Sequence, residues 1–183
     1  CQRLLPVASV LGRGFRLAAL GRGSDRADEE LFARLDEAQE ARVVVDLPTG
    51  RGGLRFSHAL IRDSLYGDLG TGERLRLHRR AAEALEELYG VDREPHLAEI
   101  AYHSFEAAPG GDIDKAIDYA RRAGDQAAAL LAYEEATRLY RMALDALELK
   151  APLDEATRCE LLLALGDAED RGGDLVSARE TFA

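Results

Sequence analysis

The sequence has no long apolar run and few cysteines. No stretch of its 183 residues approaches the roughly 20 consecutive apolar residues that a membrane-spanning helix needs. The start of the chain also lacks the basic-then-apolar layout of a secretion signal. The two cysteines, Cys1 and Cys159, show no motif spacing, which argues against a disulfide framework or a zinc site. We therefore expect a cytoplasmic protein that does not bind membranes.

A phosphate-binding loop of the Gly-x-x-x-x-Gly-Lys-Ser/Thr type is also missing. The two glycine-rich stretches, residues 11–15 and 50–53, contain no lysine, so ATP hydrolysis is not expected from this chain. Ser57, His58 and Asp63 are the residue types of a hydrolase triad, but neighbours at one helix start cannot easily place nucleophile, base and orienter in line. No nucleophile-elbow motif surrounds Ser57. We expect Ser57 to cap a helix and the chain to be non-catalytic.

Two further clusters favour ordinary structural roles. His96 and His103 are seven residues apart, about two helical turns, which is too far for both to reach one metal ion. We therefore expect no metal and no other cofactor in this chain. The basic cluster on residues 74–80 shares its segment with glutamates, and no aromatic side chains interleave with its arginines. A solvated or salt-bridged face is favoured over nucleic-acid contact for these arginines: Arg74, Arg76, Arg79 and Arg80.

Charge divides the chain into two parts. Residues 1–90 hold 14 arginines and 14 carboxylates, whereas residues 91–183 hold 10 basic and 20 acidic residues. The acidic second part argues against a nucleic-acid surface there. With 46% hydrophobic residues, each part can bury a core, so we expect two domains with these bounds. Because the chain opens without Met and closes within a helical pattern, we expect it to be a piece of a longer protein.

The first domain shows the order of a winged helix. Short apolar helices are expected over residues 4–11 and 15–20, and a third from Ser24 or Asp25 to about residue 41. The β-branched run at residues 43–46, a turn, and residues 54–56 then predict a small β-hairpin. The third helix occupies the recognition position, but its acids outnumber its arginines and would repel DNA phosphate: Asp28, Glu29, Glu30, Asp36, Glu37 and Glu40 against Arg26 and Arg34.

Helices follow the hairpin to the end of the chain. Ser57 is expected to cap a helix that the glycines of residues 67–72 end, and a longer helix then presents His78, Ala81 and Leu85 on one face up to Gly90. Residues 97–108 and 113–130 form one more helical pair without clear signature residues, separated by Pro109, Gly110 and Gly111. The second domain is therefore expected to be helical throughout.

A repeat is readable within the second domain. Gly124, Ala136, Tyr140 and Ala143 stand at offsets 0, 12, 16 and 19, and Gly166, Ala178 and Phe182 stand at offsets 0, 12 and 16. The two sets are 42 residues apart, about eight more than a tetratricopeptide period, and residues 148–154 can hold the extra loop. A glycine lets two antiparallel helices approach, and the alanine and aromatic side chains fill the gap between them. The pattern predicts a tetratricopeptide-like α-solenoid.

Two segments carry a resemblance to a family: residues 55–66, Arg-Phe-Ser-His-Ala-Leu-Ile-Arg-Asp-Ser-Leu-Tyr, and residues 75–85, Leu-Arg-Leu-His-Arg-Arg-Ala-Ala-Glu-Ala-Leu. They resemble the stretch after the ATPase core in bacterial signalling ATPases of the STAND class, which include LuxR-type regulators and multidomain adenylate cyclases. The resemblance implies a winged helix that closes a nucleotide switch and a helical-repeat arm that senses inducers or partners. It places the ATP- or ADP-binding core before Cys1.

The resemblance also implies a role for one histidine. His58 is similar in placement to a histidine that contacts the diphosphate of bound ADP in related switch ATPases, and an imidazole at a helix start can donate to an anion. We therefore expect a regulatory and protein-interaction fragment of a larger ATP-dependent signalling or transcription-regulating protein. Its partners are expected to be its own upstream ATPase core and an unknown protein or small-molecule inducer. A DNA-binding winged helix with a repeat arm is the alternative.

Overall fold

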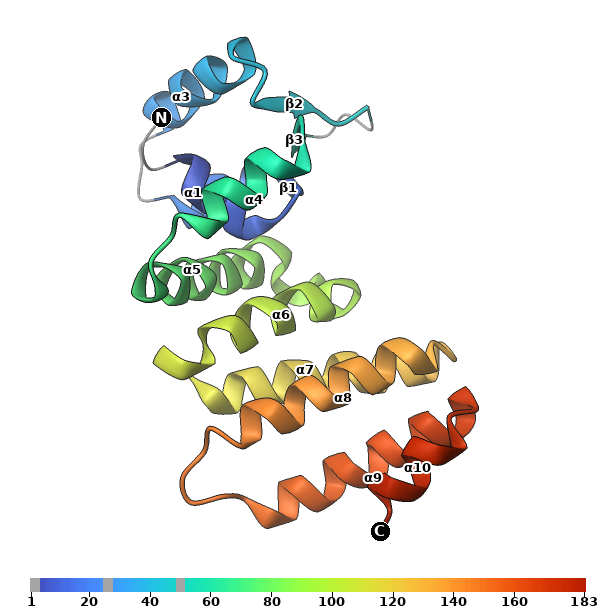
Figure 1. Cartoon of the computed structure of the whole chain (residues 1–183). Helices are drawn as coiled ribbons and strands as arrows, with labels where there is room; N and C mark the ends of the chain where they lie inside the picture. Colours follow the sequence, from blue (N-terminus) through green and yellow to red (C-terminus); the bar gives the residue numbers. More distant parts are fainter. Residues whose placement is uncertain (1–3, 25–27, 49–51) are drawn as a thin grey trace. The chain divides into compact units, whose positions relative to one another are not determined.

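The computed structural model describes residues 4–24, 28–48 and 52–183, and it divides into two compact units, Cys1–Gly90 and Val91–Ala183 (Figure 1). The described chain is mostly helical with one small antiparallel sheet, as predicted. Among the described helices, none is long and apolar enough to cross a membrane. The expected caps and charges at Asp25 and Arg26, the residues at 49–51 and Cys1 lie outside the described residues.

Unit 1 alternates short helices and strands before two final helices. The longest of these, α5, buries one face that includes the predicted His78, Ala81 and Leu85, and it ends at Gly90, whose φ of 51° suits glycine. The elements of unit 1 are α1 (Leu4–Leu11), β1 (Gly14–Arg16), α2 (Leu17–Gly23), α3 (Asp28–Glu40), β2 (Val44–Asp46), β3 (Gly53–Phe56), α4 (Ala59–Gly67) and α5 (Thr71–Tyr89).

The sheet of unit 1 has three strands in the order β1-β3-β2. The predicted hairpin is β2 and β3, and β1 adds to its other side with Phe15 opposite Leu54. The expectation of a helix over residues 15–20 was wrong at its start, because Phe15 lies in β1 and its ring packs 5.7 Å from that of Phe56. Burial of this aromatic pair outweighs the short helical pattern.

Helix faces and strand side chains together form the core of unit 1. The predicted apolar face of α3 is buried at Leu31, Leu35 and Ala38, and Phe56 of β3 is fully buried. Ser24 does not cap α3, since it ends α2 and its hydroxyl donates to the carbonyl of Gly21. The predicted apolar face of α3 therefore packs into a core that the sheet also supplies.

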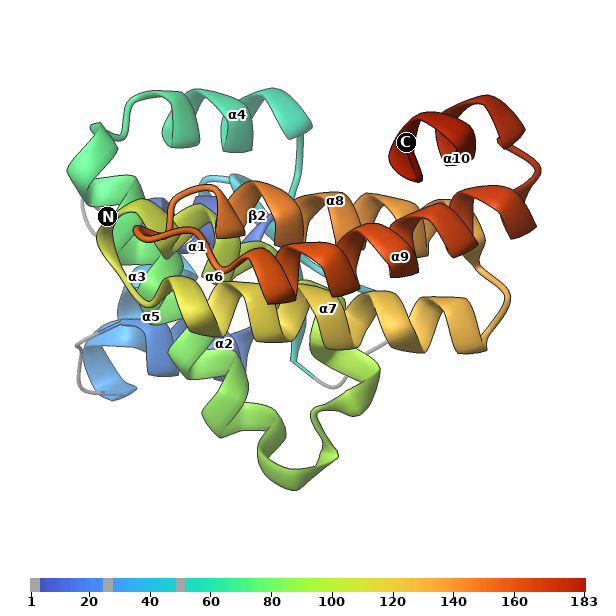
Figure 2. The same cartoon turned by 90° about the horizontal axis from the view of Figure 1, so that it is seen from below.

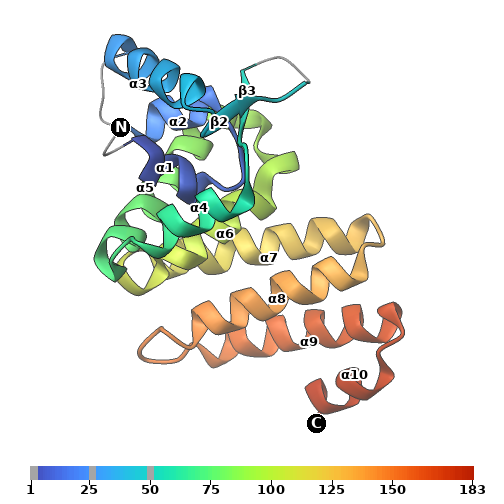
Figure 3. The same ribbon diagram turned by 45° about the horizontal axis from the view of Figure 1, so that its top comes forward.

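Unit 2 consists of helices and short 3₁₀ turns. Its α-helices are α6 (Leu97–Ala107), α7 (Ile113–Ala129), α8 (Tyr133–Leu147), α9 (Glu155–Gly172) and α10 (Leu175–Thr181). Short 3₁₀ turns cover Gly90–Asp92 at the unit boundary, Glu94–His96 and Ala108–Gly110. Each α-helix packs on the next along the chain, and Figures 2 and 3 show α7, α8 and α9 side by side.

Aspartates define where several helices of unit 2 begin. The side chains of Asp112, Asp154 and Asp174 each accept a hydrogen bond of 3.1 Å from a backbone N–H in the first turn of α7, α9 and α10 respectively. A carboxylate at this position satisfies an otherwise unpaired donor and interacts favourably with the helix dipole. Residues 148–154, predicted as an extra loop, connect α8 to α9.

Candidate functional site

In the first helix pair of the repeat, a glycine of one helix lies against an aromatic ring of the other. A Cβ added to Gly124 of α7 would lie 2.6 Å from Cε1 of Tyr140 on α8. The two helices therefore approach so closely here that only glycine fits without a shift of the ring. Tyr140 is 3% exposed, and its hydroxyl donates a 2.8 Å hydrogen bond to Asp125. Burial, with the nearby Asp125 carboxylate, raises the pKa of Tyr140 above its usual value. Ala136 and Ala143 are fully buried beside this contact.

The second helix pair repeats the contact with a different aromatic residue. A Cβ on Gly166 of α9 would overlap the ring of Phe182, which follows α10. Ala178 is buried, as is Ala136 at the same repeat offset, but Phe182 is 54% exposed. The structure therefore brings each predicted glycine to its predicted aromatic residue and leaves the second ring partly in solvent.

A buried carboxylate joins the two helix pairs. Glu169 of α9 is 2% exposed, yet one of its oxygens accepts a 2.6 Å hydrogen bond from Arg141 of α8. The other oxygen accepts a 2.7 Å bond from the hydroxyl of Thr181 on α10. A buried charge needs such partners, because an unpaired carboxylate away from water is costly. Glu169 thus connects three helices of unit 2.

A groove of about 350 Å³ lies along one stripe of α8, with Phe105 of α6 on its other side; we call it the α8 groove. Its floor is apolar, since Phe105 and Met142 are half-buried there. Its rim is charged by two arginines and two carboxylates. The α8 residues of the groove recur at helical spacing: Glu134, Thr137, Arg138, Arg141, Met142 and Asp145.

In unit 1, a buried histidine joins α4 to α5. His78 is fully buried, and its Nε2 lies 3.0 Å from the hydroxyl of Tyr66. The guanidinium groups of Arg62 and Arg74 lie 4.6 and 5.0 Å from the centre of the Tyr66 ring. Burial first, and then the charges of these two arginines, lower the pKa of His78 to about 4, so its ring is neutral at neutral pH.

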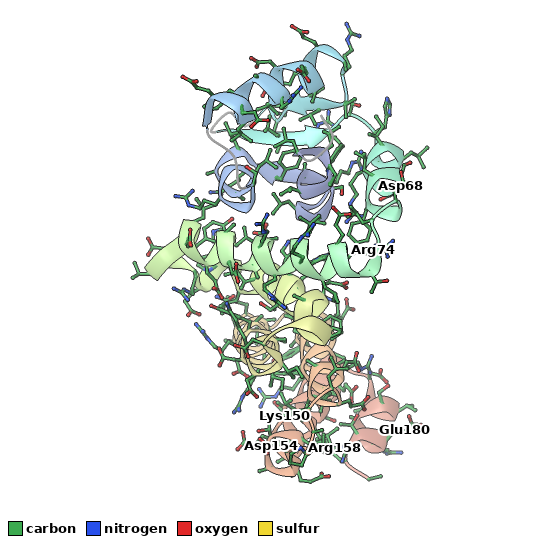
Figure 4. All side chains as sticks on the ribbon, turned by 90° about the vertical axis from the view of Figure 1, so that its left-hand side faces the viewer. Asp68, Arg74, Lys150, Asp154, Arg158 and Glu180 are labelled. Carbon is green, nitrogen blue, oxygen red and sulfur yellow. The ribbon has the colours of Figure 1, made fainter. Side chains whose placement is uncertain are left out.

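Neighbouring contacts fix that cluster to the rest of unit 1. Arg62 donates from Nε to the carbonyl of Ser9 at 2.8 Å, which ties α4 to α1. Arg74 donates to the carbonyl of Gly67 at 3.1 Å, and Figure 4 shows Arg74 near the α4–α5 connection. Arg76 pairs with Glu73 at 3.6 Å. The arginine-rich start of α5 is thus largely engaged with its own unit.

His58 lies exposed at the start of α4, where it is the N-terminal cap residue without a side-chain capping bond. The expectation that Ser57 caps this helix was wrong, because its hydroxyl is buried and has no hydrogen-bond partner in the described chain. Asp63 pairs with Arg62 at 3.2 Å. Within the part of the chain that the structure describes, no hydrogen bond joins the side chains of Ser57, His58 and Asp63.

The other predicted residues lie apart from one another. His103 is buried in α6, and His96 is half-buried in the preceding turn. Within residues 4–24, 28–48 and 52–183, no group of three or more His, Cys, Asp or Glu side chains could hold a metal ion. Figure 4 shows Lys150, Asp154 and Arg158 near one another where the loop enters α9; there, Lys150 pairs with Asp114 at 2.7 Å.

Comparison of the chain with protein-family models, curated proteins and solved structures found no match. The α8 groove and buried Glu169 were not among the residues singled out in the sequence. A signal for the groove was present, because Met142, the one methionine of the chain, falls on the polar stripe of an otherwise regular amphipathic helix. No local signal distinguishes Glu169 from the exposed acids around it.

Proposed function

We propose that this chain is the regulatory and interaction part of a larger ATP-dependent signalling or transcription-regulating protein of the STAND class. The observation that carries this proposal is the glycine–aromatic contact made at equivalent offsets in two consecutive helix pairs. Such recurrence supports a tetratricopeptide-like arm, in which stacked helix pairs create an extended binding surface. The arm binds a protein or small inducer, and unit 1 couples that binding to the nucleotide state.

The order of elements in unit 1 supports its assignment as a winged-helix-like domain. A helix and a strand precede two helices and a hairpin, and the hairpin completes a three-stranded sheet. The helix in the recognition position, α3, exposes Glu29, Asp36 and Glu40. Exposed carboxylates disfavour contact with DNA phosphates, so the proposed surface for α3 is a protein.

His58 is proposed to contact the diphosphate of ADP held by the upstream core. Its exposed position at the start of α4 supports this role, because a side chain there is open to a partner domain. An anion at a helix start is also favoured by the unpaired N–H groups of the first turn. The contact holds the protein in its resting state.

The test uses the full-length protein encoded by the gene. ADP binding by calorimetry is expected to be about tenfold weaker for His58→Ala, as expected for the loss of a hydrogen bond to a charged group, with higher basal activity. Leu60→Ala, at an 81% exposed position two residues further along the chain, serves as the control and should bind ADP normally. A full-length protein without a phosphate-binding loop and without ATP or ADP binding would overturn the STAND assignment.

A further inference from the structure

The charges of the α8 groove do not cancel within it. Arg138 donates two hydrogen bonds of 2.8 and 2.6 Å to the Glu135 carboxylate. This hydrogen bonding with Arg138 lowers the pKa of the Glu135 carboxyl below its usual range. Arg141 is held by the buried Glu169 at 2.6 Å. Both arginines of the groove are therefore neutralised by carboxylates that do not line it.

Two carboxylates of the groove are left uncompensated. Glu134 and Asp145 are exposed, and neither side chain forms an ion pair with another described residue. They stand eleven positions apart on one stripe of α8, which places them about 16 Å from each other along the helix axis. The groove therefore presents one negative charge toward each end.

Between these carboxylates, the groove offers apolar contact. Met142 and Phe105 form a half-buried floor, and Thr137 lies on the same stripe. A thioether is unbranched and polarizable, so Met142 can adapt to an incoming apolar side chain. The combination is an apolar centre between two negative ends.

We propose that the α8 groove binds a basic amphipathic helix of a partner protein, with apolar side chains on Met142 and Phe105 and a cationic side chain toward each of Glu134 and Asp145. This inference rests on the proposed function of unit 2 as a binding arm. Charge complementarity selects the occupant, because residues 91–183 carry twice as many acidic as basic residues and attract cationic partners. Nucleic acid is repelled by the same charge.

We infer that the bound segment is helical because the groove runs along one helix, α8. Its lining residues on α8 span three turns, so a second helix laid along the stripe can meet both carboxylates with one face. Cationic side chains on that face, three turns apart, match the spacing of Glu134 and Asp145. Apolar side chains of the intervening turns then face the floor.

The test uses the full 183-residue chain and a defined probe. The probe is a fluorescein-labelled, alanine-based helical peptide with two arginines three turns apart and leucines between them on the same face. Its glutamate counterpart replaces both arginines. By fluorescence anisotropy, the arginine probe is expected to bind, and Glu134→Lys with Asp145→Lys should weaken binding about tenfold, as expected for two exposed ion pairs turned to repulsion. The same double variant should bind the glutamate probe instead.

The control variant changes the net charge of the chain by the same amount, but at positions outside the groove. Asp170→Lys with Glu180→Lys reverses two exposed carboxylates outside the groove and should leave arginine-probe binding within about twofold. Equal weakening by both double variants, no exchange of preference by the groove variant, or no binding by the unaltered chain would overturn the proposal. Each of these results leaves ADP binding by the full-length protein untouched, so failure of the groove and failure of the STAND assignment are separable.

Discussion

The two units keep their close internal contacts in different ways. Unit 1 buries the neutral imidazole of His78 near two guanidinium groups, so one of its helix connections depends on a protonation state. Unit 2 brings helices together at glycines, where Gly124 and Gly166 each lie under an aromatic ring. The contact in unit 1 is therefore sensitive to pH, and those in unit 2 are sensitive to volume. Each can be disturbed without touching the other.

A second difference separates the two helix pairs of unit 2. The ring of Tyr140 is buried and anchored to Asp125, whereas the ring of Phe182 is 54% exposed. A buried ring has no room to move aside, but a half-exposed ring can turn into solvent. Equivalent repeat offsets therefore do not imply equal steric tolerance.

The largest expected effect comes from acid acting on unit 1. His78 is expected to titrate at about 4 in the folded state and near 6.5 when unfolded. The stability that depends on its neutral ring is complete above pH 6.5 and is lost as the pH falls toward 4, roughly 3 kcal/mol in all and about 2 kcal/mol by pH 5. Hydrogen exchange of the α5 amides between pH 7 and 5, corrected for intrinsic rates, measures this loss.

The control for the acid effect is His78→Gln, which removes the titrating group but can still meet Tyr66. This variant should lose the pH dependence of α5 opening between pH 6.5 and 5. Neither α7–α8 nor α9–α10 contains a histidine, so their amides provide an internal reference. An unchanged pH profile in His78→Gln would contradict the role of the buried ring.

Gly124→Ala should distinguish the two helix pairs. The new Cβ would stand 2.6 Å from the buried Tyr140 ring, so we expect a net loss of about 2 kcal/mol despite the higher helix propensity of alanine. Gly166→Ala should change the stability by less than about 1 kcal/mol, because Phe182 can move outward as the helix gains propensity. Urea unfolding followed by circular dichroism compares them. Equal losses in both variants would mean that ring exposure does not set the tolerance.

Arg141→Ala tests the link between the two pairs. Removing this arginine leaves the buried Glu169 carboxylate with the hydrogen bond from Thr181 but without its ion pair, and we expect a loss of about 2 kcal/mol. Arg138→Ala is the matched control, since its pair with Glu135 is half-exposed and should contribute less than about 1 kcal/mol. Thermal unfolding of the two variants measures the difference, and a larger effect of Arg138→Ala would contradict the assignment.

The smallest effect is expected from Tyr140→Phe, which gives the first contact the chemistry of the second. The ring stays in place over Gly124, but the 2.8 Å hydrogen bond to Asp125 is lost, at a cost of about 1 kcal/mol. Urea unfolding again supplies the measurement. Combining this change with Gly124→Ala sharpens the test, because a freer ring should reduce the penalty of the added Cβ below the sum of the single effects.

Secondary structure and contacts of this chain could be predicted from the sequence where they depend on residues close together in the chain. Apolar spacing at Leu31, Leu35 and Ala38 marked the buried face of α3, and Gly90 marked the end of α5. The offsets from Gly124 and Gly166 marked two pairs of residues that the fold brings into contact. These predictions succeeded because helical periodicity and glycine geometry act over a few residues.

The predictions that failed depended on distant neighbours. Phe15 belongs to a strand because β3, some forty residues later, pairs with it and Phe56 packs on its ring. Ser57 was expected to cap α4 by its type and place, but its hydroxyl is buried and His58 takes the cap position. Long-range strand pairing decided the first, and Ser57 itself donates its backbone N–H to the carbonyl of Val43 at 3.0 Å. Local propensity carries no record of such pairing.

The sequence by itself determined the helical character, the acidic second part and the repeated glycine–aromatic offsets, because composition and periodicity are properties of the chain alone. Only the tertiary structure decided that Glu169 is buried against Arg141, that His78 is enclosed near Arg62 and Arg74, and that Tyr140 is enclosed while Phe182 is not. Burial and charge pairing are set by which helices meet. That meeting depends on contacts between residues far apart in the chain.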